Sequence, residues 1–134
     1  MITRTTNLIV RYAETDAQGV VHHSNYLVWF EEARSDFLRQ QGLAYSDLEA
    51  SGFFVVVTEV AVTFRAPAFY EDRIAIETTL VKARGRLLEF GYRIHNAMGN
   101  LLVEGRTRHL VLGGDRRPVS LPEPVLEKLL TTRH

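Results

Sequence analysis

The sequence predicts an α+β protein with an antiparallel sheet of about five strands and one long helix. Two patterns support this class. Apolar residues recur at intervals of three and four between Asn25 and Gly42, the period of one buried helical face. From Gly52 to Leu112, apolar and polar residues mostly alternate, which is typical of half-buried strands. We expect residues 1–134 to form a single domain, because this length suits one hydrophobic core.

The N-terminal half is predicted to contain a strand, a polar loop and the long helix. Thr5–Tyr12 alternates weakly and predicts the strand. The expected buried helix face consists of Leu27, Phe30, Ala33, Phe37 and Leu38. Ser24 or Asn25 is expected to cap the helix, and Gly42 to end it in a left-handed conformation. Ser46–Glu49 reads SDLE, a capping box that predicts a short helical turn.

Four alternating segments in the second half predict consecutive strands joined by turns of hairpin length. They centre on residues 58–64, 74–80, 88–94 and 101–112. Ala66-Pro67 should end or bend the first, and Arg84-Gly85-Arg86 should form a hairpin turn. The stretch SLPEPVLEKLL predicts a short terminal helix, because proline suits the first helical turn.

Composition limits the chemistry that this chain can perform. Sixteen basic and sixteen acidic residues cancel, so no global field attracts nucleic acid or an anionic membrane. The chain has no cysteine, which excludes a thiol nucleophile and a thiolate metal site. The first ten residues lack a secretory pattern, and no apolar run reaches the roughly 18 residues of a membrane span. We expect a cytoplasmic protein without stable membrane insertion.

A sheet of this size with one helix leaves edge strands and apolar surface uncovered. We therefore expect at least a homodimer. Tyr26 and Trp29 add more aromatic bulk to the helix than one small sheet requires. Packing in the core is the favoured explanation over a ligand contact, and a subunit interface would explain the excess.

The loop between the first strand and the helix carries the candidate chemistry. Asp16 lies shortly before the predicted helix start, and Gly19 gives the loop backbone freedom. An Asx turn explains this aspartate on composition alone. Alternatively, a carboxylate near a helix N-terminus can attack a carbonyl or activate water, while exposed N–H groups stabilise the oxyanion.

His22 and His23 are the next candidates in this loop. In an extended chain, adjacent side chains point to opposite sides, so these two should not chelate one metal. No HExxH or similar ligand spacing supports a metal site, and no metal or other cofactor is expected. The chain also lacks a GxSxG elbow, a Walker loop and a dinucleotide fingerprint. One of the two histidines is expected to bond substrate or orient Asp16.

The run YAETDAQGVVHHSNYLVWFEEAR, beginning at Tyr12, resembles the start of the 4-hydroxybenzoyl-CoA thioesterase family, in the branch that accompanies the Tol-Pal envelope genes. The later RAPA, YED and TRHLV segments are similar to that family as well. The resemblance implies the hotdog fold, in which an antiparallel sheet wraps around the long helix. It implies hydrolysis of acyl-CoA to a carboxylic acid and CoA. The resemblance also implies active sites at a dimer interface. It leaves open whether the protein is a dimer or a homotetramer.

By this resemblance, Asp16 matches the catalytic carboxylate, acting as nucleophile or general base. His23 matches the residue whose backbone N–H polarises the thioester carbonyl. His22 stands where the branch often has tyrosine, and its role stays open. Further substrate-binding positions are Gly19, Val20, His22 and Tyr26. Glu59 lies on an otherwise apolar strand and is expected to face the acyl pocket from the neighbouring subunit.

The CoA phosphates require local positive charge. Lys82, Arg84 and Arg86 cluster at one predicted hairpin and are the preferred ligands, ahead of Arg106 and Arg108 on the last strand. A solvated face or cross-strand ion pairs would also explain these cations. Two other functions remain as alternatives: a non-catalytic acyl-CoA sensor or partner protein, and a hotdog enoyl-CoA hydratase or dehydratase. The chain lacks the usual histidine motif of the latter.

Overall fold

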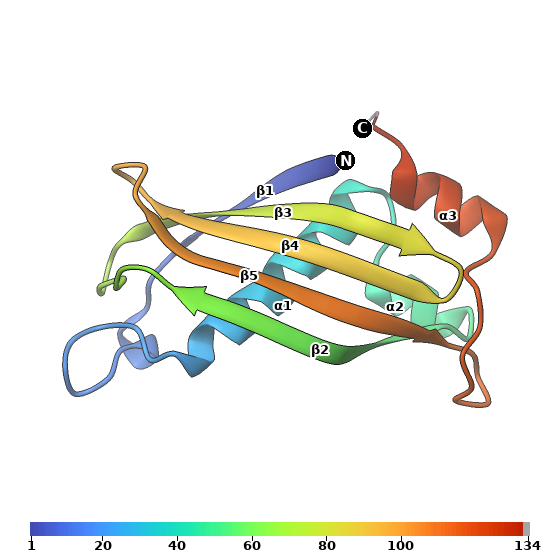
Figure 1. Ribbon diagram of the computed structural model, residues 1–134, viewed down its shortest axis with the longest axis horizontal. Coiled ribbons are helices and arrows are strands. Elements are labelled where there is room, and N and C mark those ends of the chain that lie inside the picture. The colour runs from blue at the N-terminus through green and yellow to red at the C-terminus, as the bar shows by residue number, and fades with distance from the viewer. Residues whose placement is uncertain (133–134) are drawn as a thin grey trace.

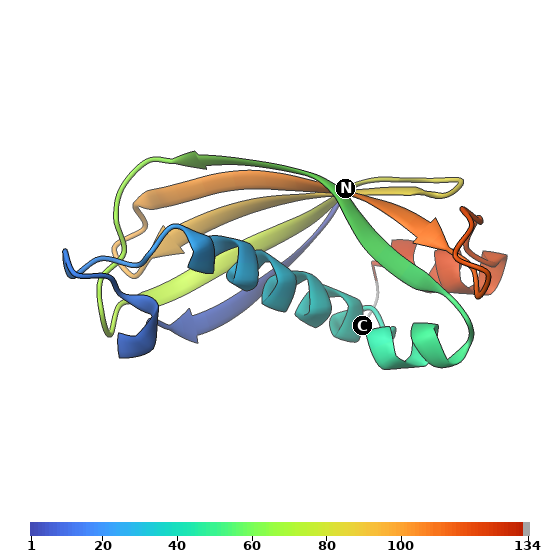
Figure 2. The same cartoon turned by 90° about the horizontal axis from the view of Figure 1, so that it is seen from below.

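The computed structural model describes residues 1–132, which form one curved sheet with a long helix against its concave face (Figures 1 and 2). The strands are β1 (Ile2–Ile9), β2 (Phe54–Phe64), β3 (Arg73–Arg84), β4 (Leu87–Asn96) and β5 (Leu101–Leu112). The helices are η1 (Tyr12–Glu14), a single 3-10 turn, then α1 (Ser24–Gln40), α2 (Tyr45–Ala50) and α3 (Glu123–Leu130). The predicted α+β class is confirmed.

The strand order is β1-β3-β4-β5-β2, with every neighbouring pair antiparallel. The predicted hairpins between β3 and β4 and between β4 and β5 are confirmed. The expectation of a hairpin between β2 and β3 is wrong. The 65–72 segment instead carries the chain across the sheet, so that β2 becomes one edge and β3 pairs with β1.

The core lies between α1 and the concave face of the sheet. Alternate residues of the inner strands point toward the helix and are buried, among them Ile74, Ile76, Phe90, Tyr92, Ile94 and Val103. On α1, Phe30 and Phe37 complete this core as predicted, whereas Leu27 is 45% exposed. Trp29 and Tyr26 are both buried, which confirms core packing for these two aromatic residues.

The other face of the sheet is covered by ion pairs that cross the strands. Arg108 contacts Glu59 at 3.1 Å and Glu89 at 2.7 Å. Glu104 contacts Arg65 and Arg93, each at 2.8 Å. The three arginines are about half exposed, whereas Glu89 is 15% exposed, so these ion pairs lie over the strands and make much of the convex face polar.

Several boundaries differ from the prediction. β1 begins and ends three residues earlier than expected, because Ile2–Ile9 pairs with β3, and Tyr12 instead lies in the η1 turn. Gly42 follows α1 with φ 76°, as predicted for its left-handed stop. Helix α2 forms, but the capping box does not, because Ala44 occupies the N-cap without a side-chain hydrogen bond.

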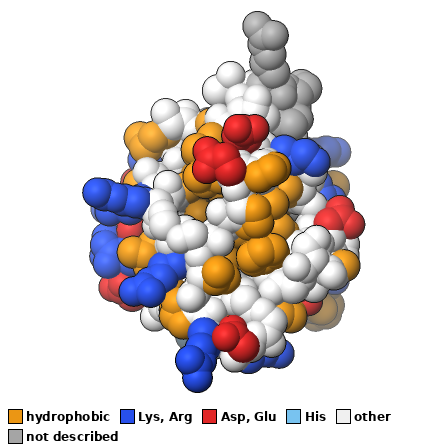
Figure 3. Space-filling view, turned by 90° about the vertical axis from the view of Figure 1, so that its right-hand side faces the viewer, with side chains coloured by type: hydrophobic (Ala, Val, Ile, Leu, Met, Phe, Trp, Pro, Cys, Tyr) orange, Lys and Arg blue, Asp and Glu red, His pale blue; other side chains and the backbone are white. Residues whose placement is uncertain are grey.

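The end of the molecule that carries α2, α3 and the β3–β4 hairpin presents a group of hydrophobic side chains (Figure 3). A crevice lies between the elements at this end, lined by residues such as Leu48, Val55, Leu121 and Val125. Its volume is about 10 Å³. This is room for about one water molecule, so the crevice is closed to larger ligands.

Candidate active site

The loop after η1 folds into a small hairpin that returns the chain to the start of α1. Thr15 pairs with Val21, and the N–H of Asp16 donates to the Val20 carbonyl at 2.8 Å. Gly19 closes the turn with φ 82°, a left-handed conformation that glycine adopts readily. The Val21 N–H donates to the Ala68 carbonyl at 2.9 Å, so the hairpin is attached to the 65–72 segment.

Asp16 is the first residue of the turn in this hairpin, since its carbonyl accepts the Gly19 N–H at 3.0 Å. Its Oδ1 accepts the N–H of Gln18 at 2.8 Å, so the Asx turn considered from the sequence is present. Among the hydrogen bonds of residues 1–132, the second carboxylate oxygen accepts none. The side chain is half-buried. The turn therefore fixes the carboxylate and leaves one oxygen for other chemistry.

Helix α1 is capped differently from the prediction. His23 is the N-cap, with helical φ −56° and ψ −28°, and makes no side-chain cap bond. Instead, His22 Nδ1 accepts the Ser24 N–H at 3.2 Å and lies 2.8 Å from Ser24 Oγ. Asn25 donates through Nδ2 to the Glu14 carbonyl at 2.9 Å rather than capping the helix. Within the described part of the chain, the His23 N–H donates to no group.

The two histidine rings lie on the same side of the chain. Their centroids are 4.2 Å apart and their planes are inclined by 31°. The expectation that they point to opposite sides is wrong, because His23 has helical rather than extended dihedral angles. Both side chains are exposed, and Phe64 at the end of β2 lies 6.5 Å from the His23 ring. The start of α1 and the end of β2 thus meet here.

Tyr26 and Trp29 form the buried base of this region. Their rings meet edge to face at 5.1 Å, and Phe64 lies 5.6 Å from Tyr26. Tyr26 is only 3% exposed, and burial raises the pKa of its hydroxyl. In this chain Tyr26 therefore packs beneath the loop. Phe64, which is 53% exposed, presents the accessible aromatic surface.

Glu14 was not singled out from the sequence, yet it holds the loop against α1. Its Oε2 accepts the Trp29 indole N–H at 2.7 Å, and its Oε1 accepts the Arg11 N–H at 2.8 Å. Burial alone would raise the pKa of the Glu14 carboxyl, but these hydrogen bonds and the Arg11 guanidinium lower it below its usual value. An acidic residue two positions before Asp16 and a single tryptophan in the helix were the available sequence signals.

The remaining predicted site residues lie away from Asp16 in this chain. Lys82, Arg84 and Arg86 surround the β3–β4 hairpin, at the opposite end of the sheet from the Asp16 loop (Figure 1). All three are exposed. Glu59 lies on the convex face, where it pairs with Arg108 at 3.1 Å. One chain alone does not bring these four side chains to the aspartate.

A buried polar chain crosses the core beside these elements. Arg34 Nη1 donates to Tyr92 Oη at 3.1 Å, and Tyr92 Oη lies 2.7 Å from Thr107 Oγ1. Thr107 Oγ1 lies 2.7 Å from His109 Nε2. Arginine can only donate, so Tyr92 Oη accepts from Arg34, and the short contacts continue the chain through Thr107 to His109. Burial, followed by the Arg34 charge, lowers the pKa of His109 to about 3, so the ring is neutral near pH 7.

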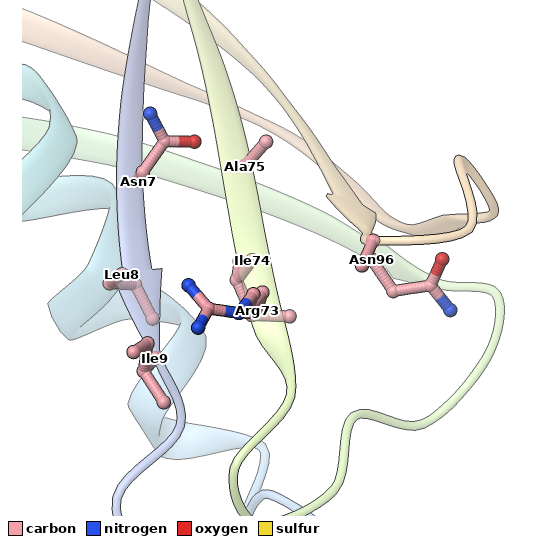
Figure 4. A pocket seen from close by; sticks show the side chains of 8 residues that line it. Asn7, Leu8, Ile9, Arg73, Ile74, Ala75 and Asn96 are labelled. Atoms are coloured by element: carbon pink, nitrogen blue, oxygen red, sulfur yellow. The ribbon is translucent and has the colours of Figure 1, made fainter.

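A concavity elsewhere on the surface contributes nothing to the site. A concavity of about 380 Å³ lies on β1, β3 and the end of β4. Arg73 there points toward β1, whereas Asn96 points away from it (Figure 4). The donors do not converge on one ligand.

Among residues 1–132, no three His, Asp or Glu side chains lie close enough to hold a metal ion.

A curved five-stranded antiparallel sheet around one long helix is the arrangement of hotdog-fold proteins of the thioesterase class. The chain belongs to the thioesterase-like superfamily, whose family pattern matches residues 10–129.

Individual relatives agree with this assignment. The Escherichia coli protein named acyl-CoA thioester hydrolase YbgC is 36% identical over 120 residues, covering 87% of this chain and 88% of the relative. A DHNA-CoA thioesterase from Staphylococcus aureus superposes with a TM-score of 0.90 at 32% identity, over 96% of this chain and 89% of the other. The hypothetical protein TT1821 from Thermus thermophilus has a TM-score of 0.89 and 46% identity, over 93% and 95% of the two chains.

Proposed function

We propose that this protein hydrolyses acyl-CoA thioesters to a carboxylic acid and CoA. The observation that carries the proposal is the small hairpin that ties Asp16, with one free carboxylate oxygen, to the segment entering α1. The His23 N–H at the helix start is the matching donor. It has no acceptor among the described residues, and the helix dipole favours negative charge there.

The reaction uses these two groups on opposite sides of the thioester carbonyl. Asp16 either attacks the carbonyl carbon, giving a mixed anhydride that water then cleaves, or removes a proton from an attacking water. In both routes the carbonyl oxygen becomes an oxyanion that the His23 N–H stabilises. The C–S bond breaks as the carbonyl re-forms, and CoA leaves as a thiolate. The proton given up by the hydrolytic water neutralises this thiolate, and Asp16 is again a free carboxylate. A thioester needs less activation than an amide, so no full triad is required.

A second copy of the chain completes the site in this proposal. The edge of β1 is partly covered, since Gln40 Nε2 donates to the Thr5 carbonyl at 3.3 Å. The β2 edge is longer and exposes the apolar side chains Val57 and Val60. Two β2 strands related by a two-fold axis pair antiparallel. The start of the second β2 then lies beside Phe64 and His23 of the first.

The same pairing gives the distant cations a role. It brings the β3–β4 hairpin of the second copy to the end of the combined sheet that carries the first copy's Asp16. Lys82, Arg84 and Arg86 are then the proposed ligands of the CoA phosphates. Glu59 would lie near the dimer edge rather than deep in an acyl pocket, because its carboxylate is held by Arg108. Gly19, Val20 and His22 line the entrance from the loop.

The proposal is tested by incubating the protein with aromatic and aliphatic acyl-CoAs and following free thiol, with identification of the released acid. We expect equal amounts of thiol and acid from at least one substrate. Tight binding without thiol release would instead indicate an acyl-CoA sensor. Water addition to an enoyl-CoA with the thioester intact would indicate a hydratase.

Within residues 1–132, no helix is long and apolar enough to cross a membrane. The proposed site uses no metal ion or other cofactor, since CoA is part of the substrate.

A further inference from the structure

Glu14 joins the segment that precedes Asp16 to the helix that follows it. Its carboxylate accepts two hydrogen bonds, at 2.8 Å and 2.7 Å, and its carbonyl accepts two more, each at 2.9 Å. The carboxylate donors are the Arg11 N–H and the Trp29 indole, and the carbonyl donors are the His22 N–H and the Asn25 amide. One residue therefore fixes both sides of the loop.

The Glu14 side chain is itself excluded from the reaction. It is 5% exposed, and each of its carboxylate oxygens already accepts a hydrogen bond. A nucleophile or general base must reach the substrate, whereas this nearly buried carboxylate is held by the Arg11 N–H and the Trp29 indole. Its effect has to pass through the residues that it holds.

The bond to Trp29 determines where the loop sits on α1. Trp29 lies in the second turn of the helix and is buried, so its indole is a fixed point. Hydrogen bonds to a carboxylate are about twice as strong as neutral ones. Replacing the carboxylate by an amide would set an NH₂ group against one of the two N–H donors. Asp16 lies two residues after Glu14, and a displacement of about 1 Å can cost about 100-fold in rate.

We propose that Glu14 is a positioning residue: through Trp29 and His22 it sets the place of the Asp16 carboxylate relative to the N-terminus of α1. This inference rests on the proposed thioester hydrolysis. It assigns to a buried acid a role that depends on Asp16.

The kinetic test uses Glu14→Gln in the wild-type and Asp16→Asn backgrounds, with the acyl-CoA that wild type hydrolyses fastest. In the wild-type background we expect kcat to fall about 10- to 100-fold, with KM within about 3-fold. In the Asp16→Asn background we expect no further loss, because the positioned group is already missing. Trp29→Phe removes the same hydrogen bond from the other side and should lower kcat in the same way. Glu49→Gln, an exposed change on α2, is the matched control and should leave kcat unchanged.

A spectroscopic readout tests the geometry without turnover. Trp29 is the single tryptophan, so one indole N–H resonance reports its hydrogen bond. Glu14→Gln should shift this resonance and speed exchange of the indole and His22 N–H groups about 10-fold, with β4 amides unchanged. Wild-type turnover combined with an unchanged kcat in Glu14→Gln would overturn only this proposal. An equal loss in both backgrounds would do the same, because it would indicate a general folding effect. Absence of wild-type turnover would overturn the proposed hydrolysis as well.

Discussion

Adding a single methyl group at Gly105 should force the long helix away from the sheet. Gly105 lies in β5 opposite Tyr92, on the face that packs against α1. A Cβ there would lie 2.5 Å from Phe30 Cζ and 2.6 Å from Cε2. Carbon atoms normally approach to about 3.5–4.0 Å, so the added Cβ would be about 1 Å too close to the Phe30 ring. The Phe30 ring cannot retreat easily, because it is buried and stacked on Tyr92 at 4.2 Å.

The expected cost of Gly105→Ala is about 1–3 kcal/mol of unfolding free energy, the usual range for an overfilled core. At about 3–5 °C per kcal/mol for a chain of this size, Tm should fall by about 3–15 °C. A decrease in unfolding free energy would be informative, because replacing a strand glycine by alanine usually favours folding by about 0.5–1 kcal/mol.

Gly91→Ala provides the matched control. Gly91 lies in the neighbouring strand on the opposite face, and its nearest contact would be Val81 Cγ2 at 3.3 Å. Val81 is exposed and can move, so we expect unchanged or slightly higher stability. Thermal and urea unfolding at equal protein concentration would compare the two variants. If Gly105→Ala proved as stable as Gly91→Ala, the close packing of Phe30 on β5 would be refuted.

Other substitutions test the buried polar chain and the open sheet edge. Thr107→Val should cost about 1–3 kcal/mol in urea unfolding, because it leaves the buried His109 Nε2 without a partner and removes one of the two partners of the Tyr92 hydroxyl; an unchanged midpoint would contradict that chain. His109 has a folded pKa of about 3. Its unfolded pKa is about 6.5, so the unfolded state binds more protons and stability falls as pH drops from about 6.5 toward 3. Between pH 7 and pH 5 the unfolding free energy should fall by about 2 kcal/mol through this group. His109→Leu should abolish that fall. If the unfolding free energies of wild type and variant changed equally with pH, the ring would be accessible to solvent in the folded protein. Val60→Lys on the β2 edge should shift sedimentation toward monomer and lower thiol release together. A variant that stayed associated would argue against pairing through this edge.

Periodicity and turn residues were enough to predict the main elements and the two hairpins of β3, β4 and β5, but not the positions of β1 and β2 in the sheet. The long helix and the limits of β5 follow from local patterns, and Gly42 ends the helix as expected. The crossing between β2 and β3 did not follow, because alternation shows which side of a strand is apolar and not which strand lies next to it. Likewise, the position of β1 depends on its register with β3.

The site was predictable only as far as its local chemistry. A turn-forming aspartate before a helix can be read from the sequence, and Asp16 is found in that turn. The cap of α1 could not be predicted, because it depends on the orientation of the His22 ring toward Ser24. Glu14 was missed for a similar reason: its partner Trp29 is fifteen positions away and becomes a neighbour only when the helix packs.

Whether Asp16 is a catalytic carboxylate or only a turn residue is decided by comparing thiol release from acyl-CoA by Asp16→Asn and Asp115→Asn. Asp115 Oδ1 accepts the Arg117 N–H at 3.0 Å, the same Asx turn that Asp16 makes with Gln18, and asparagine preserves both turns. We predict that Asp16→Asn lowers kcat/KM by at least about 100-fold, whereas Asp115→Asn stays near wild type. If Asp16→Asn kept wild-type turnover, the carboxylate would be only a turn residue and the proposed mechanism would be wrong.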